Sequence, residues 1–407
     1  MNFYDIMAER GLIFQTTDDN LREYFEVNKQ ITAYCGFDPT ASSLHVGSLV
    51  PIMCMKWLQK CNHRTISLIG GATALIGDPS GKSESRKMLT VEEVDTNAQL
   101  IERQLRDCYD VENPYYHFFL NNSGWLNKVP WVDMLRIIGP HFSVAHMLSM
   151  DSVKSRLSTG LTALEFNYML MQAYDFYYLN FMHGCTIQIG GQDQWGNIIM
   201  GIDLIRKKFS QRTYGLTFPL LTQSNGKKFG KSETGNIWLD EKLTSNFDFF
   251  QFWRNVPDKD VEKLLRFLTM RPLKEISEMV STDINHAKEI LAYDVTSMVR
   301  SEPTARRTMY DIKSGFKKSG DVTGENIPSK VISIEDIKTG IQLKMLLREI
   351  GIAQSNSEGQ RMIKENSISV NDVKINDMTY IVTDNDIVKN SIVIRHGKKS
   401  LFRIDIR

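Results

Sequence analysis

The sequence predicts an α/β protein with a parallel sheet in its first half, followed by an α-helical region and a small α+β module. In the first half, short apolar runs alternate with stretches of helical periodicity, a pattern typical of parallel sheets. Residues 314–330 hold three glycines, a proline and several hydroxyl side chains, which indicates a linker before a separate module. The 407 residues suffice for two or three domains at roughly 150 residues each.

The predicted elements alternate along the chain. Strands are predicted for the apolar runs 31–37, 65–70 and 185–189, and helices for about 44–60, 91–108 and 162–181. The periodicity is helical throughout residues 246–300. Beyond the linker, two short helical runs mix with short alternating segments. We therefore expect a parallel-sheet domain over 1–232, an α-helical domain over 233–325 and an α+β module over 331–407.

Composition excludes several classes of protein. Apolar residues make up 42% and charged residues 24% of the chain, which excludes disordered and fibrous folds. No apolar run approaches the ~18 residues of a membrane span. Residues 1–15 have neither the apolar core of a signal peptide nor the profile of an organelle transit peptide. The five cysteines form no C-x-x-C pair, so we expect reduced thiols in the cytoplasm rather than disulfides or a zinc site.

Charge is balanced overall but uneven along the chain. With 49 basic and 48 acidic residues, net charge predicts neither a nucleic-acid nor a membrane partner. Residues 204–232 nevertheless hold seven basic residues and no acidic one, and a second basic stretch covers residues 306–318. Such stretches are either solvated faces or surfaces that neutralise phosphate. Charge alone leaves both interpretations open.

A phosphate-binding loop is the first chemical motif to test. Residues 77–83 resemble one, but three residues separate the first glycine from Gly-Lys-Ser where the motif needs four, and Ile76 stands where the glycine belongs. No G-x-G-x-x-G follows any predicted strand. The sequence therefore disfavours a P-loop kinase and a dinucleotide-binding enzyme.

The segment from Ala33 to Ser48 carries more information. A predicted strand ends at a glycine, a short turn follows, and His45 and Gly47 open a helix. The free amides and the dipole of a helix N-terminus attract anions, and a histidine adds a donor at the same place. A lone histidine at a helix start is more often a structural cap, so the segment is only suggestive when taken alone.

Three further segments carry polar groups in ordered patterns. The spacing of Tyr168, Gln172 and Asp175 puts them on one helical face, which is either the wet side of a helix or a pocket wall with Asp175 as the acceptor for a hydroxyl. Residues 188–197 run from a strand into glycines, amides and an acid, as at the carboxyl edge of a sheet or in a plain turn. Residues 228–232 place two lysines on a glycine-containing loop, which suits a polyphosphate or a solvated loop.

Taken together and in this order, these elements resemble the bacterial-type tyrosyl-tRNA synthetases, over essentially the whole chain. The stretch His45-Val-Gly-Ser48 is similar to the family's HIGH motif and 228–232 to its KMSKS motif. Tyr34 and the Tyr-x-x-x-Gln-x-x-Asp face match the tyrosine pocket, and 190–197 matches the Gly-Gly-x-Asp-Gln segment. One departure from the family is Ser48, which stands where the HIGH motif has its second histidine.

The resemblance implies a Rossmann-like catalytic domain and assigns its residues. The resemblance assigns catalytic roles at the phosphates to Thr40, His45, Lys228 and Lys231. Contacts to tyrosine fall to Tyr34, Gly36, Asp78, Tyr168, Gln172, Asp175 and Gln188. Contacts to ATP fall to Asp38, Gly47, Ser48, Gly190, Asp193, Gln194 and Lys231. Asp78 would act as a counter-charge to the substrate amine.

The implied reaction has two steps. The tyrosine carboxylate attacks the α-phosphate of ATP, which enters with Mg²⁺ as substrate, and a hydroxyl of the terminal tRNA adenosine then attacks the tyrosyl-adenylate. The first step needs positioning and charge stabilisation but no side-chain nucleophile and no protein-ligated metal. The resemblance also implies a homodimer, for which the apolar run 131–138 could supply the interface. The partners are thus tRNA(Tyr), L-tyrosine and ATP, without a membrane.

The last part of the chain is similar to the S4-type RNA-binding domain. The resemblance covers residues 360–371 and a late Gly-Lys-Lys. With twelve basic and ten acidic residues from 331 onward, RNA affinity would need a local patch rather than bulk charge. The candidate patch is Arg361, Lys364, Lys398 and Lys399. Besides the kinase, the alternatives are the sister tryptophanyl enzyme, which Tyr34 and Asp175 disfavour, and a non-catalytic RNA-binding or splicing factor.

Overall fold

The computed structural model describes residues 2–80, 88–109, 116–157, 160–222, 224, 229–232, 235–315, 327–397 and 400–407. Two compact units are present. The first comprises Met1–Asp240 and Lys259–Thr282, and the second comprises Glu241–Asp258 and Asp283–Arg407. Each unit is described by itself below.

The first unit is built on a sheet whose described part has six strands in the order β1-β6-β5-β2-β3-β4. Neighbouring strands are parallel, except that β1 at the edge runs antiparallel to β6. The strands are β1 Gln15–Thr16, β2 Thr32–Phe37, β3 Arg64–Ile69, β4 His117–Asn121, β5 Cys185–Gly191 and β6 Tyr214–Phe218. The parallel α/β fold predicted from the sequence is confirmed.

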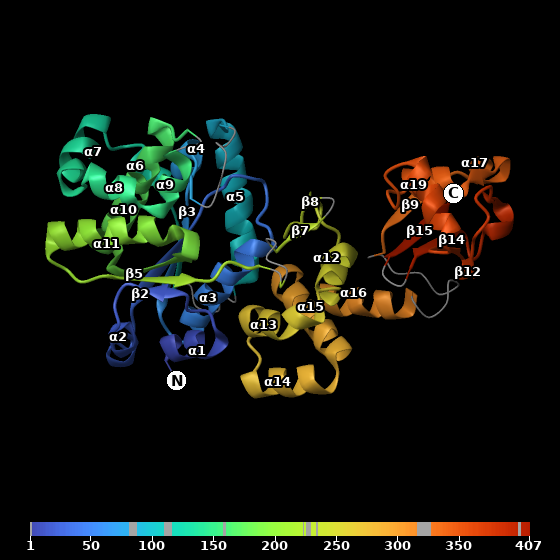
Figure 1. Ribbon diagram of the computed structural model, residues 1–407, viewed down its shortest axis with the longest axis horizontal. Helices are drawn as coiled ribbons and strands as arrows, with labels where there is room; N and C mark the ends of the chain where they lie inside the picture. Colours follow the sequence, from blue (N-terminus) through green and yellow to red (C-terminus); the bar gives the residue numbers. More distant parts are fainter. Residues whose placement is uncertain are drawn as a thin grey trace. The chain divides into compact units, whose positions relative to one another are not determined.

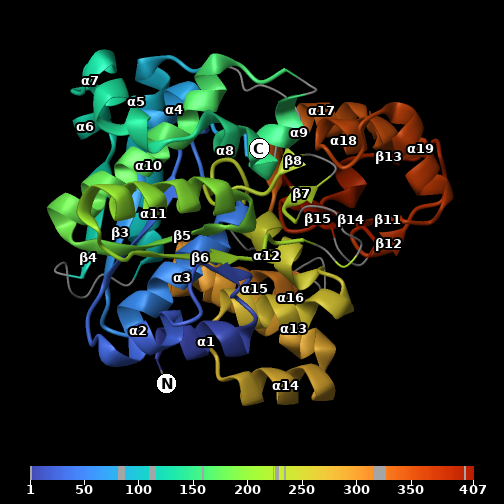
Figure 2. The ribbon, with the colours of Figure 1, turned by 60° about the vertical axis from the view of Figure 1, so that its left-hand side comes forward.

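Helices cover both faces of this sheet. Helix α3 (Leu49–Lys60) packs on one face together with α1 (Phe3–Arg10), while α10 (Ala163–His183) and α11 (Trp195–Phe209) pack on the other (Figures 1 and 2). Helix α10 begins with a capping box between Thr162 and Glu165 and ends at Gly184 in the left-handed region. These two signals explain why the helix has the limits that its sequence pattern predicts.

The remaining elements of the first unit are short, apart from α5, α13 and α14. The helices are α2 Leu21–Val27, α4 Thr73–Ile76, α5 Val91–Cys108, α6 Ser123–Leu126, α7 Trp131–Ile138, α8 Val144–Ser149, α9 Asp151–Leu157, α13 Asp258–Leu268 and α14 Leu273–Thr282. The 3₁₀ helices are η1 Val46–Ser48, η2 Gly139–His141 and η3 Gln192–Gln194. The strands β7 Lys231–Ser232 and β8 Gly235–Asn236 form a hairpin.

Strand order creates a crevice at the centre of the sheet. From β2 the chain moves outward to β3 and β4, and it then returns through α10 to β5 on the opposite side of β2. At such a reversal the connections after the two adjacent strands diverge, so their carboxyl ends leave an open crevice. The residues that follow β2 and β5 therefore line one site.

The second unit contains a helical part and a β-rich module. The helical part packs α12 (Asn246–Arg254) against α15 (Ile284–Arg300) and α16 (Glu302–Gly315). The described part of the module has a five-stranded sheet in the order β12-β11-β14-β15-β9. Its elements are β9 Ser329–Ile332, α17 Ile334–Thr339, β10 Ile341–Gln342, α18 Leu343–Glu349, α19 Asn356–Lys364, β11 Ile368–Val370, β12 Val373–Lys374, β13 Ile381–Val382, η5 Asp384–Asp386, β14 Ser391–His396 and β15 Ser400–Ile406.

The limits of the predicted linker differ from those of the structure. Helix α16 extends to Gly315 and β9 begins at Ser329, so both ends of the range 314–330 belong to regular elements. Strand β9 pairs in parallel with β15 and so belongs to the sheet of the C-terminal module. The glycines and serines that predict a linker also occur at the ends of helices and strands, which explains the overlap.

Candidate active site

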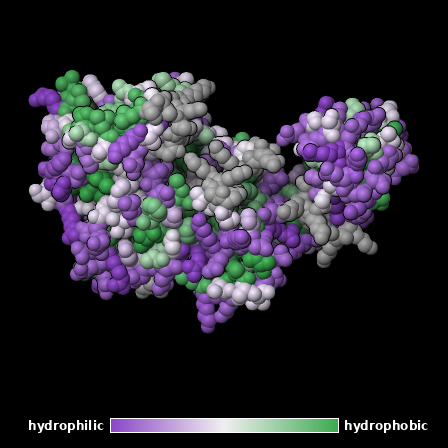
Figure 3. Space-filling view, in the orientation of Figure 1, coloured by the Kyte–Doolittle hydropathy of each residue, from purple (hydrophilic) through white to green (hydrophobic). Residues whose placement is uncertain are grey.

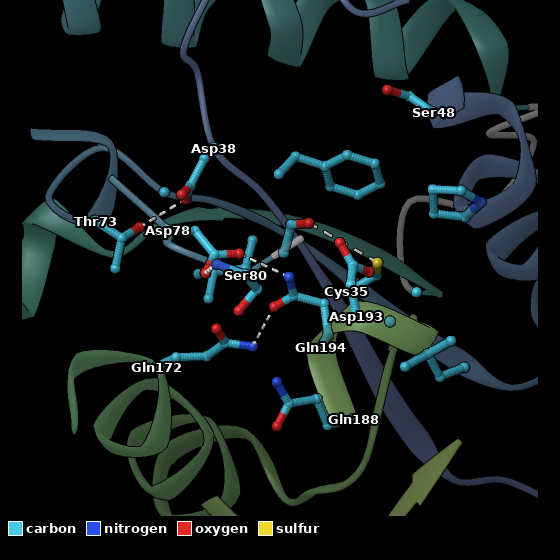
Figure 4. A pocket seen from close by; sticks show the side chains of 18 of the residues that line it. Cys35, Asp38, Ser48, Thr73, Asp78, Ser80, Gln172, Gln188, Asp193 and Gln194 are labelled. Atoms are coloured by element: carbon cyan, nitrogen blue, oxygen red, sulfur yellow. Dashed lines mark hydrogen bonds between the residues drawn. The ribbon is translucent and has the colours of Figure 1, made fainter. Parts of the chain in front are cut away.

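A cavity of about 350 Å³ opens at the carboxyl ends of β2 and β5. Figure 4 shows the polar side chains that converge on it from the ends of both strands and from α10. The sequence-predicted residues that line it are Tyr34, Gly36, Asp38, Thr40, His45, Gly47, Ser48, Asp78, Tyr168, Gln172, Asp175, Gln188, Gly190, Asp193 and Gln194. Lys228 lies outside the described residues, and only the backbone of Lys231 is described, in β7.

One part of the cavity is a buried polar cluster around Asp175. Its two carboxylate oxygens accept hydrogen bonds from Asn122 Nδ2 at 2.9 Å and from Trp125 Nε1 at 2.8 Å. Burial raises the pKa of Asp175 from its ordinary 3.8 to about 7, although both hydrogen bonds oppose this shift. A carboxyl group held in this way can accept one more hydrogen bond from a ligand.

The hydroxyl of Tyr34 belongs to the same cluster. The side chain is 1% exposed, and its hydroxyl has no hydrogen-bond partner among the described residues. Burial, and then the neighbouring charge of Asp175, raise the pKa of Tyr34 well above its ordinary value. Since leaving a buried hydroxyl unpaired costs about 1–3 kcal/mol, its position beside a carboxylate indicates a ligand with its own hydroxyl. The Oε1 atom of buried Gln188 is likewise without a partner in the described part of the chain.

A chain of hydrogen bonds lines a second part of the cavity. Asp78 accepts a bond of 2.7 Å from Gln194 Nε2, and Gln194 Oε1 accepts one of 3.2 Å from Gln172 Nε2 (Figure 4). Asn197 Nδ2 donates to Gln172 Oε1 at 2.9 Å, which orients that amide. Together these groups present one carboxylate and several amide dipoles, an arrangement suited to an ammonium group.

Asp38 joins the end of β2 to two other elements. It accepts hydrogen bonds from the Tyr168 hydroxyl at 2.7 Å and from Thr73 Oγ1 at 2.8 Å. Burial, followed by the charges of Asp38 and Asp78, raises the pKa of Tyr168 well above its ordinary value. A Cβ atom on Gly70 would approach both Asp38 and Thr73 to under 3.0 Å, so only glycine fits there.

His45 is oriented by the segment that it opens. The Gly47 amide donates to His45 Nδ1 at 3.0 Å. Because Nδ1 accepts this bond, the neutral ring carries its proton on Nε2, which can then donate to a ligand oxygen. A second cavity, of about 330 Å³, shares His45 and Thr40 with the first and is also lined by Asn236 and Trp238. The two cavities form one elongated site.

Three supporting residues were missed in the sequence. Asn122 and Trp125 hold Asp175, and Thr73 holds Asp38. Asn122 immediately follows β4, a strand that the sequence analysis did not predict, so the site at its carboxyl end could not be inferred. A prediction of β4 would have supplied the signal, because polar residues after a parallel strand are candidates for a site.

The other candidate positions are outside this cavity. Arg361 and Lys364 are exposed on α19, three residues apart on the same side of the helix, whereas Lys398 and Lys399 lie outside the described residues. Within the described ranges, no group of three or more His, Cys, Asp or Glu side chains could hold a metal ion. No helix in those ranges is long and apolar enough to cross a membrane.

Comparisons with known proteins define the class. A family model described as "tRNA synthetases class I (W and Y)" matches residues 26–317, and one described as "Tyrosine--tRNA ligase SYY-like C-terminal domain" matches residues 321–404. The chain therefore belongs to the class I tRNA synthetases of the tryptophan and tyrosine group.

The relatives specify the branch within that group. The chain is 45% identical to a tyrosine–tRNA ligase of Clostridium kluyveri over 100% of both chains, and 44% identical to one of Clostridium botulinum over 99% of both. A truncated mitochondrial tyrosyl-tRNA synthetase of Aspergillus nidulans superposes with a TM-score of 0.69 at 31% identity, over 77% of this chain and 93% of that one. Within the class, the chain is a member of the tyrosine–tRNA ligase family.

The fold is shared more widely than the sequence. A tyrosyl-tRNA synthetase of Archaeoglobus fulgidus, solved with L-tyrosine, superposes with a TM-score of 0.58 at 17% identity over 76% of this chain and all of that one. A tryptophanyl-tRNA synthetase of Plasmodium falciparum superposes with a TM-score of 0.54 at 16% identity, over 75% of this chain and 84% of that one. At these identities the similarity concerns the fold alone.

Proposed function

We propose that the chain activates L-tyrosine with ATP to tyrosyl-adenylate and pyrophosphate, and then transfers the tyrosyl group to the terminal adenosine of tRNA(Tyr). The observation that carries this proposal is the buried pair of Tyr34 and Asp175. A hydroxyl that has no partner among the described residues and lies near a carboxylate suits the phenol of tyrosine, and it would leave unpaired polar groups when phenylalanine binds. The indole of tryptophan would fill the same cavity without the hydroxyl that this pair requires.

The positions of the other residues in the cavity support their proposed roles. Asp78, with Gln172 and Tyr168, takes the substrate ammonium group because its carboxylate supplies the counter-charge. This holds the tyrosine carboxylate toward Gly190, Asp193 and the ends of β2 and β5, where the α-phosphate must approach. Asp38, Gly47, Ser48 and Gln194 contact the nucleotide, which enters with Mg²⁺ as part of the substrate.

The part of the site that includes the second cavity would stabilise the leaving pyrophosphate. Thr40 Oγ1 and His45 Nε2 donate to phosphate oxygens, and Lys228 and Lys231 supply positive charge. The reaction needs no protein nucleophile, because the substrate carboxylate is itself the attacking group. Catalysis then rests on holding two substrates in line and on neutralising charge that develops as the pyrophosphate leaves.

Pyrophosphate exchange into ATP with each amino acid alone is the deciding experiment. The expected result is exchange that depends on tyrosine and is negligible with tryptophan or phenylalanine. Exchange with tryptophan would identify the sister activity, and exchange without any amino acid would indicate a kinase-like activity. Absence of exchange in a folded chain that still binds RNA would favour the non-catalytic alternative.

We also propose that the chain acts as a homodimer through α7. Figure 3 shows hydrophobic side chains gathered over α7 at the surface of the first unit. Trp131 is 60% exposed and Val132 63%, and Leu135 is also exposed, which is unusual for one short helix. The variant Trp131→Lys should therefore shift the chain from dimer to monomer in sedimentation, with Met345→Lys, an exposed apolar residue in the other unit, as the control. A Trp131→Lys chain that stays dimeric would contradict this interface.

The C-terminal module is proposed to bind tRNA through Arg361, Lys364, Lys398 and Lys399. Support comes from the exposure of the first two on α19 and from the basic Gly-Lys-Lys in the printed sequence. We also propose a cytoplasmic location, where tRNA charging would serve protein synthesis. Replacing Arg361 by Ala should weaken tRNA binding and reduce the slope of its salt dependence by about one.

A further inference from the structure

The segment Gly235–Leu239, which we call the coupling segment, lies between the two phosphate-facing motifs of the site. On one side it forms the β7–β8 hairpin, in which Lys231 pairs with Asn236. On the other side it pairs with the segment that opens at His45, through a bridge between His45 and Trp238. One short stretch of backbone is thus hydrogen-bonded to both motifs.

The bonds converge on a single residue of the coupling segment, Ile237. Its amide donates to the Gly230 carbonyl at 3.0 Å, and its carbonyl accepts from the Val46 amide at 3.0 Å. A third bond, from the Leu239 amide to the Leu44 carbonyl at 2.8 Å, extends the pairing with the His45 side. Both backbone groups of Ile237 are therefore used, one toward each motif.

The two motifs also touch directly. Gly230 has φ +88°, and a Cβ atom built on it would approach Val46 Cγ2 to under 3.0 Å. Val46 is fully buried, so it cannot move aside into solvent. The close packing of Gly230 on Val46 thus needs a residue without a side chain.

Trp238 extends this contact to the catalytic ring. The indole and the His45 imidazole meet edge-on, with 6.5 Å between ring centroids and 63° between ring planes. The Gly47 amide holds the Nδ1 edge of the ring at the same time. Trp238 and Asn236 also line the second cavity with His45 and Thr40.

We propose that the coupling segment is a positioning element for adenylate formation. It fixes the position of the backbone at Gly230 and Lys231 relative to the ring of His45. This rests on the proposed function, in which His45 and Lys231 act on the phosphates. The contact between Gly230 and Val46 maintains this relative position, and Trp238 restrains the ring of His45. None of these three residues touches the substrate in this role, so each acts through a neighbour.

The first test is a double-mutant cycle in the full chain with Gly230→Ala and Val46→Ala. We expect Gly230→Ala to lower the maximal rate of tyrosine-dependent exchange at least tenfold, with tyrosine affinity, measured without ATP, within twofold of wild type. Adding Val46→Ala removes the methyl group that the new Cβ meets, so it should restore the rate at least threefold. This recovery would show that the two residues are coupled through this contact, and the unchanged tyrosine affinity separates the loss of rate from a loss of general stability.

Gly235→Ala is the matched control. Gly235 lies in the same hairpin with φ +121°, but a Cβ atom there would meet no heavy atom of the described residues within 4 Å. The Gly235→Ala variant tests backbone strain without the collision, and we expect its maximal rate of tyrosine-dependent exchange to fall less than threefold. The proposal is overturned by a normal rate in Gly230→Ala, by a double variant no better than Gly230→Ala, or by tyrosine affinity that falls in step with the rate.

A second cycle does not depend on the folding of Gly230→Ala. Trp238→Leu should slow exchange about tenfold in the wild-type chain but less than twofold in a His45→Ala chain, because its effect passes through that ring. Equal losses in both backgrounds would refute the positioning role of Trp238. Failure of the wild-type chain to exchange with tyrosine would instead refute the proposed function.

Discussion

Replacing Asp175 by Asn should weaken tyrosine binding with little change in shape. Asp175 accepts from Asn122 at 2.9 Å and from Trp125 at 2.8 Å, and its remaining accepting capacity is available to the proposed phenol. An amide has only one accepting oxygen, so its NH₂ group meets one of these donors, and the bond to the phenol loses its charge. A hydrogen bond to a charged group contributes about 1.5–3 kcal/mol, which corresponds to roughly 10- to 150-fold weaker binding.

The pH dependence of binding gives a sharper test, because burial raises the pKa of Asp175 to about 7. Below that pH the carboxyl group takes up a proton and loses an accepting position, so tyrosine affinity should fall by up to tenfold per pH unit. Above it, the carboxylate accepts the phenol proton and affinity should be constant. Free tyrosine does not change its own charge between pH 5.5 and 8, so the dependence reports on the protein.

Folding stability should move in the opposite direction. Between pH 4 and pH 7 the unfolded chain has released the Asp175 proton, while the folded chain still holds it. The unfolded state therefore binds fewer protons, and the free energy of unfolding falls as the pH rises through this window. In Asp175→Asn this contribution is absent.

The assay is tyrosine affinity by equilibrium dialysis from pH 5.5 to 8, for wild type, Asp175→Asn and Tyr34→Phe. Wild type should lose tyrosine affinity below pH 7. Asp175→Asn should bind tyrosine weakly at every pH, and Tyr34→Phe should keep the pH dependence of wild type. A flat wild-type profile, or an Asp175→Asn chain that binds tyrosine normally, would refute the assignment of the phenol to Asp175.

Three further outcomes are expected. Lys231→Ala should lower the rate of adenylate formation about 10²–10³-fold with little change in tyrosine affinity, in stopped-flow and dialysis measurements; an equal fall in both would contradict its role on the leaving group. Ser48→Ala should cost less than about 1 kcal/mol in pyrophosphate exchange and clearly less than His45→Ala, since serine is short, and equal losses would show that both contribute alike. A chain ending at Lys318, after α16, should still exchange pyrophosphate but charge tRNA poorly; full charging would remove the C-terminal module from the reaction.

Much of the fold could be predicted because its periodic segments coincide with its elements. The amphipathic run 91–108 is helix α5, and its limits follow from the capping box between Thr90 and Glu93. Strand β5 was predicted although polar Thr186 and Gln188 alternate with its apolar residues, and Gln188 is buried as well because helices cover both faces of the sheet. Strands β4 and β6 were missed, since their apolar runs are short and contain polar residues or a glycine.

The division into domains is harder to predict from the sequence than the individual helices and strands. The run 246–300 is helical as predicted, yet α14 and nearly all of α13 belong to the first unit while α12 and α15 belong to the second. One reason is Arg10, which is buried over the Trp57 ring and donates to three carbonyls, including that of Thr269, at the end of α13. A single arginine near the chain start gives no periodic signal for such a long-range contact.

The site illustrates the same limit at closer range. The motifs name residues that line the cavity, because those side chains carry the chemistry in their own type and spacing. The groups that hold them, such as Asn122 for Asp175 and Thr73 for Asp38, reach the site because β3 and β4, which precede them in the chain, end at the same edge of the parallel sheet as β2. Their own segments carry no motif, and their role is defined by a hydrogen bond across more than thirty residues of chain. Variants at Asn122 should therefore be interpreted as changes in the charge state and orientation of Asp175 rather than as losses of a direct contact with tyrosine.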